Sequence, residues 1–340
     1  MRRDTGLWAD VRELSESVAA TIDAADGFDE TAALLSGAGV RRIVASGNGA
    51  AYYVAHALWL AASGPKAGGP EVVAVPSGLI AGGWFRFHPG DRLLAVSSSG
   101  EFRDLVEALE RRAVPEPYAA VTATAGSTIE RGAGARALQR VLNQRAVTHT
   151  QALAGGVACA LAVWARLSGD GDLLAALADL PGVLAAAVEE AEAWAEELGA
   201  LARPAAAVAF SAGPGWAAAL EAALLLKEVA GVPAEGVDAR EGATSAMYAL
   251  GEPHLAVSLP VGDPAEAEAE RVCGETGARV IRCPGGGRAD ARLALATTLP
   301  SATALAAVLA ERAGLDVDRP AWVDAYYRTA RRAPASAGDG

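Results

Sequence analysis

One pattern occurs twice along this chain and constrains its fold more than any other feature. An apolar segment at 41–46 is followed by a glycine turn at 47–49 and by a helical pattern at 50–62. The same order returns at 206–211, with a second glycine turn at 213–215 and another helical pattern after it. A strand, a glycine turn and a helix form the first unit of an open parallel sheet. The repeat therefore predicts two such sheets in succession.

Further apolar segments supply the remaining strands of each sheet. They lie at 71–76, 93–97 and 118–122 in the first half and at 254–261 and 278–283 in the second. Parallel strands need crossover connections, and the right-handed rule for those connections predicts a doubly wound sheet with helices on both faces. We therefore expect an α/β protein made of two flavodoxin-like three-layer sandwiches.

Alanine-rich stretches at 147–167 and 173–201 have the pattern of helices that join the halves, with a break at 169–171. A last helix is expected at 301–313, with Ser301 as its N-terminal cap. The predicted organisation is an N-terminal helical segment at 1–35, a first domain at 36–168, a bridging helix at 169–200, a second domain at 201–330 and a disordered tail at 331–340.

Composition excludes several classes of function. A net charge of −12 would repel nucleic acid. Uninterrupted apolar runs, such as 157–165, fall short of the roughly 18 to 20 residues that a membrane span needs, and charged residues follow Met1 where a secretory signal would be apolar. The widely spaced Cys159, Cys273 and Cys283 fit neither a disulfide framework nor a metal site, so we expect buried thiols. These features predict a cytoplasmic protein that binds neither nucleic acid nor membranes.

Two glutamates in the second half are the clearest candidates for chemistry. Glu221 and Glu228 are seven positions apart, so both project from one face of a helix. Leu220 and the leucines at 224–226 surround them, which suits a packed helix better than a solvated one. A carboxyl group in an apolar pocket has its pKa raised toward neutrality, as a general base requires.

A serine-rich turn in the first half suggests a site for an anion. Ser97, Ser98 and Ser99 follow a strand and precede the helical pattern at 103–112. Hydroxyl groups and the free N–H groups of a helix N-terminus together bind phosphate well. An ordinary serine-rich turn between a strand and a helix would show the same pattern.

Three segments resemble the double-SIS (sugar isomerase) family, which includes the isomerase domain of glucosamine-6-phosphate synthase. The segment ALEAALLLKE at 219–228, with Glu235 after it, resembles the family's ALEGALKLKE...HAE. The segment SSSGEFRD at 97–104 resembles its phosphate loop SQSGET.D, and QRAVTHTQA at 144–152 resembles E..VASTKAFT. The resemblance spans roughly 35–325 and implies two tandem SIS domains, each a doubly wound parallel sheet flanked by helices.

The resemblance also implies an activity and a set of residues. The activity is aldose/ketose isomerisation or amino-sugar deamination of a sugar or sugar phosphate, through an enediol or enolamine and without metal or organic cofactor. Glu228 would be the base, with Glu221 and Lys227 at matching positions and His149 as a replacement for a missing ring-opening histidine. The implied substrate-binding residues are Gly47, Asn48, Gly49, Ser97, Ser98, Ser99, Val147, Thr150, Glu235 and Thr244. The family's pocket lies at a subunit interface, so a homodimer is expected.

Departures from the family motifs keep two other functions open. Phe102 stands where the phosphate loop has threonine, Ala50 and Ala51 replace a threonine and a serine, and Thr244 occupies the position of the ring-opening histidine. One alternative is a sugar-phosphate-binding sensor or partner subunit without catalysis. The other is a specialised isomerase or lyase for an unphosphorylated or nucleotide-linked sugar.

Overall fold

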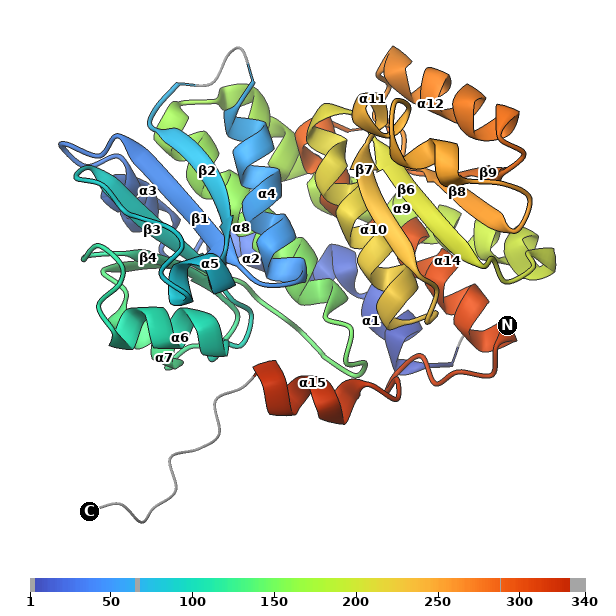
Figure 1. Ribbon diagram of the computed structural model, residues 1–340. Helices are drawn as coiled ribbons and strands as arrows, with labels where there is room; N and C mark the ends of the chain where they lie inside the picture. The colour runs from blue at the N-terminus through green and yellow to red at the C-terminus, as the bar shows by residue number, and fades with distance from the viewer. Residues whose placement is uncertain (1–3, 65–67, 288, 331–340) are drawn as a thin grey trace.

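The computed structural model describes residues 4–64, 68–287 and 289–330. The predicted disordered tail at 331–340 lies outside the described residues. Within them, two parallel sheets stand side by side with helices packed around each (Figure 1).

The first sheet has the strand order β2-β1-β3-β4-β5 and the second the order β7-β6-β8-β9, with every neighbouring pair parallel. The α/β fold with two doubly wound sheets is thus confirmed. The strands are β1 (Arg42–Gly47), β2 (Glu71–Pro76), β3 (Asp91–Val96), β4 (Ala119–Thr122), β5 (Ala135–Leu138), β6 (Ala206–Ser211), β7 (Ala234–Asp238), β8 (His254–Ser258) and β9 (Arg279–Arg282).

Helices fill the connections and cover both faces. Those before the second sheet are α1 (Gly6–Arg12), α2 (Leu14–Ala24), α3 (Phe28–Leu35), α4 (Ala50–Ala62), α5 (Ser77–Ala81), α6 (Arg103–Glu110), α7 (Thr128–Gly132), α8 (Thr150–Ser168), α9 (Gly171–Glu197) and the 3₁₀ turn η1 (Leu198–Ala200). Those after it begins are η2 (Gly213–Gly215), α10 (Trp216–Glu228), α11 (Ala239–Gly242), η3 (Ala246–Ala249), α12 (Pro264–Glu275), η4 (Ala291–Leu293), α13 (Ala294–Thr297), α14 (Leu299–Arg312) and α15 (Val323–Ala330).

The sequence patterns miss two strands, β5 and β7, and both lie at the edge of a sheet. An edge strand pairs on one side only and faces solvent, so it needs less apolar sequence than a central strand. The residues of β7, AEGVD, illustrate this.

The expected cap at Ser301 is wrong. Helix α14 begins two residues earlier, at Leu299. The Ser301 hydroxyl instead donates a hydrogen bond to the Pro284 carbonyl oxygen at 2.7 Å. The break at 169–171 is confirmed, because Gly169 adopts a left-handed φ of 70° after α8 and the Asp170 carboxylate caps α9 by accepting from Leu173 N at 2.9 Å. The proposed domain boundaries stay predictions.

Three helical stretches are long and apolar enough, by length and composition, to cross a membrane. The apolar window in 150–168 is 89% buried and that in 291–312 is 100% buried, whereas the window in 171–200 is 33% buried. Counting only uninterrupted apolar runs therefore underestimated the apolar length of these helices. For α8 and the 291–312 stretch, burial in the core accounts for the apolar sequence.

The three cysteines are free and buried, as expected, and burial raises the pKa of each thiol.

Candidate functional site

The topology of the first sheet places a crevice between β1 and β3. The chain leaves β1 through α4 toward β2 and leaves β3 through α6 toward β4, on opposite sides of that pair. In open α/β sheets, ligands bind at the carboxyl ends of two such strands. A cavity of about 310 Å³ lies here, lined by Asn48 and Gly49 after β1 and by the serine loop, residues 97–102, after β3.

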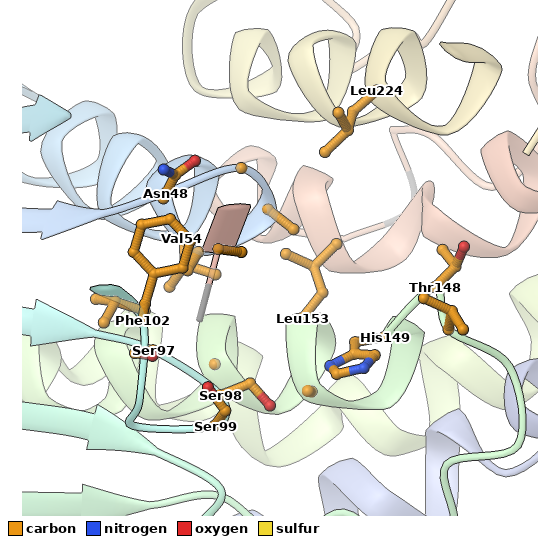
Figure 2. Close-up of a pocket in the computed structure, with 18 of the residues that line it drawn as sticks. Asn48, Val54, Ser97, Ser98, Ser99, Phe102, Thr148, His149, Leu153 and Leu224 are labelled. Atoms are coloured by element: carbon orange, nitrogen blue, oxygen red, sulfur yellow. The ribbon is translucent and has the colours of Figure 1, made fainter. Parts of the chain in front are cut away.

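The other walls of the cavity come from distant parts of the chain. Val147, Thr148 and His149 lead into α8, which adds Leu153, and Figure 2 shows His149 and Leu153 on the α8 side of the cavity. Helix α10 contributes Glu221, Leu224 and Glu228. Helix α15 crosses from the second half toward the first (Figure 1), and its segment contributes Trp322, Tyr326, Tyr327 and Ala330.

Two glycines allow the loops after β1 and β3 to form. A Cβ on Gly47 would lie 2.6 Å from the Ala51 carbonyl carbon, so glycine lets β1 approach the first turn of α4. Gly100 has a φ of 63°, and a Cβ there would collide with the Ser127 side chain. Both positions are therefore restricted to glycine by backbone geometry.

The serine loop uses its own hydroxyls to hold its shape. Ser97 Oγ accepts from Gly100 N and Ser99 Oγ accepts from Glu101 N, each at 3.2 Å. The Glu101 carboxylate accepts from Thr128 N at 2.7 Å and ties the loop to α7. These N–H groups are thus engaged within the loop. What Ser97 and Ser99 offer a ligand is the proton of each hydroxyl, because a hydroxyl that accepts one bond can still donate another.

Buried Glu221 and partly buried Glu228 form an acidic pair on α10. Glu221 is 4% exposed and its Oε2 accepts no hydrogen bond in the described part of the chain. Burial, reinforced by the charge of Glu228, raises the pKa of Glu221 to about 8. Burial also raises the pKa of Glu228 to about 7, opposed by the charge of Lys227. Carboxyl groups with these pKa values can accept and return a proton near neutral pH.

Tyr53 of α4 lies close enough to this pair to sense its charge. Burial first, and then the charges of Glu221 and Glu228, raise the pKa of Tyr53 to about 12. The phenol is therefore neutral at physiological pH.

Two more buried polar atoms line the cavity without a partner among the described residues. They are Gln139 Oε1 and Thr148 Oγ1, on side chains that are 4% and 6% exposed. Figure 2 shows Thr148 in the segment that leads to His149. Buried polar atoms in native proteins are nearly always hydrogen-bonded, so Gln139, Thr148 and Glu221 together indicate a place for a polar ligand.

Asp10 holds the segment that carries these cavity residues. Asp10 is fully buried, and its Oδ2 accepts from Arg145 N and Ala146 N, both at 2.9 Å. The Asp318 carbonyl oxygen accepts from Val147 N at 3.0 Å, and the Asp318 carboxylate accepts from Gly6 N and Leu7 N. Asp10 and Asp318, which lie near the two ends of the described chain, thus hold the segment 145–147 that precedes His149.

The sequence-predicted residues divide into two groups. Nine of them line the cavity: Asn48, Gly49, Ser97, Ser98, Ser99, Val147, His149, Glu221 and Glu228. Five do not: Gly47 packs behind the turn, Thr150 is buried in the first turn of α8, and Lys227, Glu235 and Thr244 are exposed. The roles of both groups stay predictions.

Sequence reasoning missed Gln139, Thr148 and the aromatic residues at 322–327. The aromatic cluster Trp322, Tyr326 and Tyr327 was a detectable signal, because aromatic residues make up only 5% of the chain. The Trp322 indole N–H donates to the Glu228 carbonyl oxygen at 2.7 Å. This hydrogen bond holds the residue that precedes α15 against the C-terminal end of α10.

The second sheet has a corresponding crevice between β6 and β8, but a side chain fills it. Glu266 of α12 is 2% exposed. Its carboxylate accepts from Val261 N at 2.7 Å, Gly262 N at 3.0 Å and Ala212 N at 3.3 Å. An internal carboxylate thus takes the N–H groups that would otherwise be free for an anion.

Several solved structures share this architecture over most of their length. The C-terminal domain of glucosamine-fructose-6-phosphate aminotransferase from Francisella tularensis has a TM-score of 0.78 and 17% identity, over 92% of this chain and 98% of that one. Glucosamine-6-phosphate deaminase from Thermotoga maritima has a TM-score of 0.76 and 16% identity, over 93% and 97%. This chain has the double-SIS fold. Tagatose-6-phosphate ketose/aldose isomerase from Escherichia coli shares the fold too, with a TM-score of 0.73 and 17% identity, over 93% and 95%. No family model and no curated protein matches the sequence.

Proposed function

We propose that this double-SIS protein is a sugar or sugar-phosphate aldose/ketose isomerase, or an amino-sugar deaminase, with Glu228 as its base. The observation that carries the proposal is the acidic pair Glu221, which is buried, and Glu228, which is partly buried; both line the cavity that the serine loop also lines. A carboxylate with a pKa of about 7 is half ionised at neutral pH, which suits both removal and return of a proton. The names of the structural neighbours support the same reaction class.

In the proposed isomerisation, Glu228 removes the proton from C2 of the open-chain aldose, the bonding electrons form the C1–C2 double bond, and O1 takes a proton from Glu221 to complete the enediol. The ionised Glu221 then takes the O2 proton as the C2 carbonyl forms, and Glu228 delivers its proton to C1. In a deamination, the same steps begin from an amine at C2 and pass through an enolamine, and water then releases ammonia. Glu221, whose higher pKa keeps it protonated at neutral pH, is proposed as the group that exchanges protons with O1 and O2.

The other proposed roles follow from position in the cavity. Ser97, Ser98 and Ser99 offer hydroxyl groups to the far end of the substrate, and His149 is proposed to open the sugar ring. A cytoplasmic location and a homodimer belong to the same proposal. Lys227, Glu235 and Thr244 would contribute only through a rearrangement or across a subunit interface, because they are exposed and outside the lining.

Glu228→Gln tests the proposal. The substitution keeps the shape of the side chain and removes its ability to accept a proton, so exchange of solvent deuterium into C1 or C2 should fall by about 10²- to 10⁴-fold. NMR of the sugar in D₂O measures this exchange, across a panel of hexoses, hexosamines and their 6-phosphates. Glu252→Gln, at an exposed loop position, is the matched control and should exchange at the wild-type rate. Wild-type exchange in Glu228→Gln would refute the role of the base.

A sugar-binding protein without catalysis is the second candidate. Two observations favour it. Lys227 is exposed and does not line the cavity, and the position of the family's ring-opening histidine is occupied by Thr244, which is also exposed and outside the lining. It predicts that a sugar raises the unfolding temperature of the wild type while no member of the panel exchanges deuterium.

A further inference from the structure

Two adjacent glycines stand in the middle of the buried helix α8. Gly155 and Gly156 belong to a stretch, 150–165, in which every residue of the helix is buried. Glycine is the poorest helix former after proline, and alanine, the residue that α8 uses most, is the best. A neighbour that approaches the helix backbone closely would explain why alanine is absent at these two positions.

That neighbour is the side chain of Gln139. A Cβ on Gly155 would lie 3.2 Å from Gln139 Cβ and 3.3 Å from Gln139 Oε1, and a Cβ on Gly156 would lie 3.6 Å from Gln139 Nε2. The contact with Gln139 Cβ is shorter than the separation that two carbon atoms prefer. The glycines therefore let Gln139 pack directly against the backbone of α8, and an alanine at 155 would displace its amide.

The backbone around Gln139 is also held in place. Gln139 follows β5 directly, and its N–H donates to the Thr122 carbonyl oxygen at the end of β4 at 3.0 Å. The next N–H, of Arg140, donates to Thr21 Oγ1 of α2 at 2.9 Å. Contacts with β4, α2 and α8 thus determine where the Gln139 amide lies.

This amide has an acceptor without a partner. Gln139 lines the cavity and is 4% exposed, and its Oε1 accepts no hydrogen bond in the part of the chain that the structure describes. Leaving a buried acceptor unpaired is unfavourable. A hydroxyl group of a ligand can both donate and accept, so it pairs with the amide whichever of its two polar atoms faces the ligand.

The proposed reaction limits which hydroxyl group of a hexose this is. C1 and C2 change during the reaction, and O5 closes the pyranose ring. C6 is at the far end of the sugar, which the serine loop is proposed to hold. The hydroxyl groups on C3 and C4 remain.

We infer that Gln139 is a specificity-determining residue that accepts a hydrogen bond from the C3 or C4 hydroxyl group of a hexose, and that Gly155 positions it. The inference rests on the proposed function for the kind of ligand and for the carbons that react. It holds whether or not the sugar carries a phosphate group.

Sugar binding to the full chain tests the inference. D-Glucose, D-glucosamine and the 6-phosphate of each are titrated by calorimetry, and the tightest binder of the four is then compared with its 3-deoxy and 4-deoxy analogues. One of the two analogues should bind at least about tenfold more weakly than the parent sugar, because Gln139 Oε1 then stays buried without a donor. If neither analogue binds more weakly, or if none of the four sugars binds, the inference is wrong.

Gln139→Met connects this discrimination to the amide. Methionine keeps the unbranched shape of the side chain and removes the amide, so the parent sugar and the discriminated analogue should bind within about twofold of each other. Wild-type discrimination in Gln139→Met, even with a lower unfolding temperature, would show that the amide serves the fold alone and would overturn the inference.

Gly155→Ala tests the positioning role. Gly155 does not line the cavity, yet the new methyl group should displace the Gln139 amide and reduce the discrimination between the parent sugar and the same analogue. The matched control is Gly182→Ala in α9, where a Cβ would meet no atom within 4 Å, and it should keep the wild-type discrimination. Wild-type discrimination in Gly155→Ala would refute the positioning role.

These titrations do not depend on turnover. Discrimination through Gln139 without deuterium exchange would support the inference and refute the proposed reaction. Deuterium exchange with equal binding of the parent sugar and both analogues would support the reaction and refute the inference.

Discussion

Replacing Glu221 by glutamine should make the protein more stable, and the gain should grow with pH. Glu221 is 4% exposed, and burial raises its pKa from 4.5 to about 8. In the folded chain the carboxyl group therefore stays protonated through a pH range in which the unfolded chain has already ionised it. The stability that protonated Glu221 provides is complete below pH 4.5 and is lost as the pH rises through about 8.

The size of the effect follows from the difference between the two pKa values. Each pKa unit corresponds to about 1.4 kcal/mol, so a group that titrates at 4.5 when unfolded and at about 8 when folded costs about 4 to 5 kcal/mol at high pH. Much of this cost appears between about pH 5 and pH 8.5, where linkage gives about 4 kcal/mol. Glutamine has nearly the shape of the protonated carboxyl group and does not ionise, so the variant avoids the cost.

Urea denaturation of the wild type and of Glu221→Gln at about pH 5 and pH 8.5 measures the difference directly. The two proteins should be similar at the lower pH, and the variant should be more stable by several kcal/mol at the higher one. Glu252→Gln, on an exposed loop, should show no such divergence. If the difference between Glu221→Gln and the wild type is the same at both pH values, Glu221 is not held in its protonated form by burial, and the reasoning for the acidic pair is refuted.

Three other substitutions test how the two crevices are built. Glu266→Gln should cost about 2 to 4 kcal/mol in urea denaturation, because the amide keeps one acceptor oxygen, loses the negative charge and turns an NH₂ group toward a backbone N–H that the carboxylate accepted from. Asp10→Asn should cost about 1 to 3 kcal/mol and should speed amide hydrogen exchange in residues 139–149, because it weakens the hydrogen bonds that hold this segment; unchanged exchange there would show that Asp10 does not hold the segment. Gly100→Ala should lower stability by about 1 to 3 kcal/mol, since the residue has a φ of 63° and a methyl group would collide with Ser127, and a wild-type unfolding temperature would contradict this.

Central strands and long helices could be predicted from the sequence because each carries a local signal. The patterns at 206–211 and 50–62 coincide with the central strand β6 and with α4. The signal is strong there because the central strands are covered on both faces and the helices pack against them. Edge position alone does not explain why β5 and β7 were missed, because β2 and β9 also lie at sheet edges and were predicted; β7, AEGVD, has two acidic residues and a glycine.

Part of the site could be predicted for the same reason, and part could not. Glu221 and Glu228 share a helical face, so the spacing alone places them together. Lys227 was grouped with them by resemblance, yet one position along a helix is a rotation of about 100°, which turns its side chain to solvent. Gln139 and Thr148 lie outside helices, and their positions depend on contacts such as those of Asp10, more than a hundred residues away in sequence.

The two crevices of this fold show how one repeated unit can carry one site. Both sheets present backbone N–H groups at the carboxyl ends of their central strands, but in the second sheet the carboxylate of Glu266 already binds them. In the first crevice, no carboxylate does this among the described lining residues: the Ser97 and Ser99 hydroxyls accept from N–H groups of their own loop and keep their protons for a ligand, and α10 and α15 of the second half also line the cavity. The second half therefore contributes the acidic pair and the aromatic segment, while the first contributes the hydroxyls. Because neither half holds both sets, any chemistry in this cavity depends on how the two halves pack, and substitutions at the α4–α10 contact should alter it without touching the ligand.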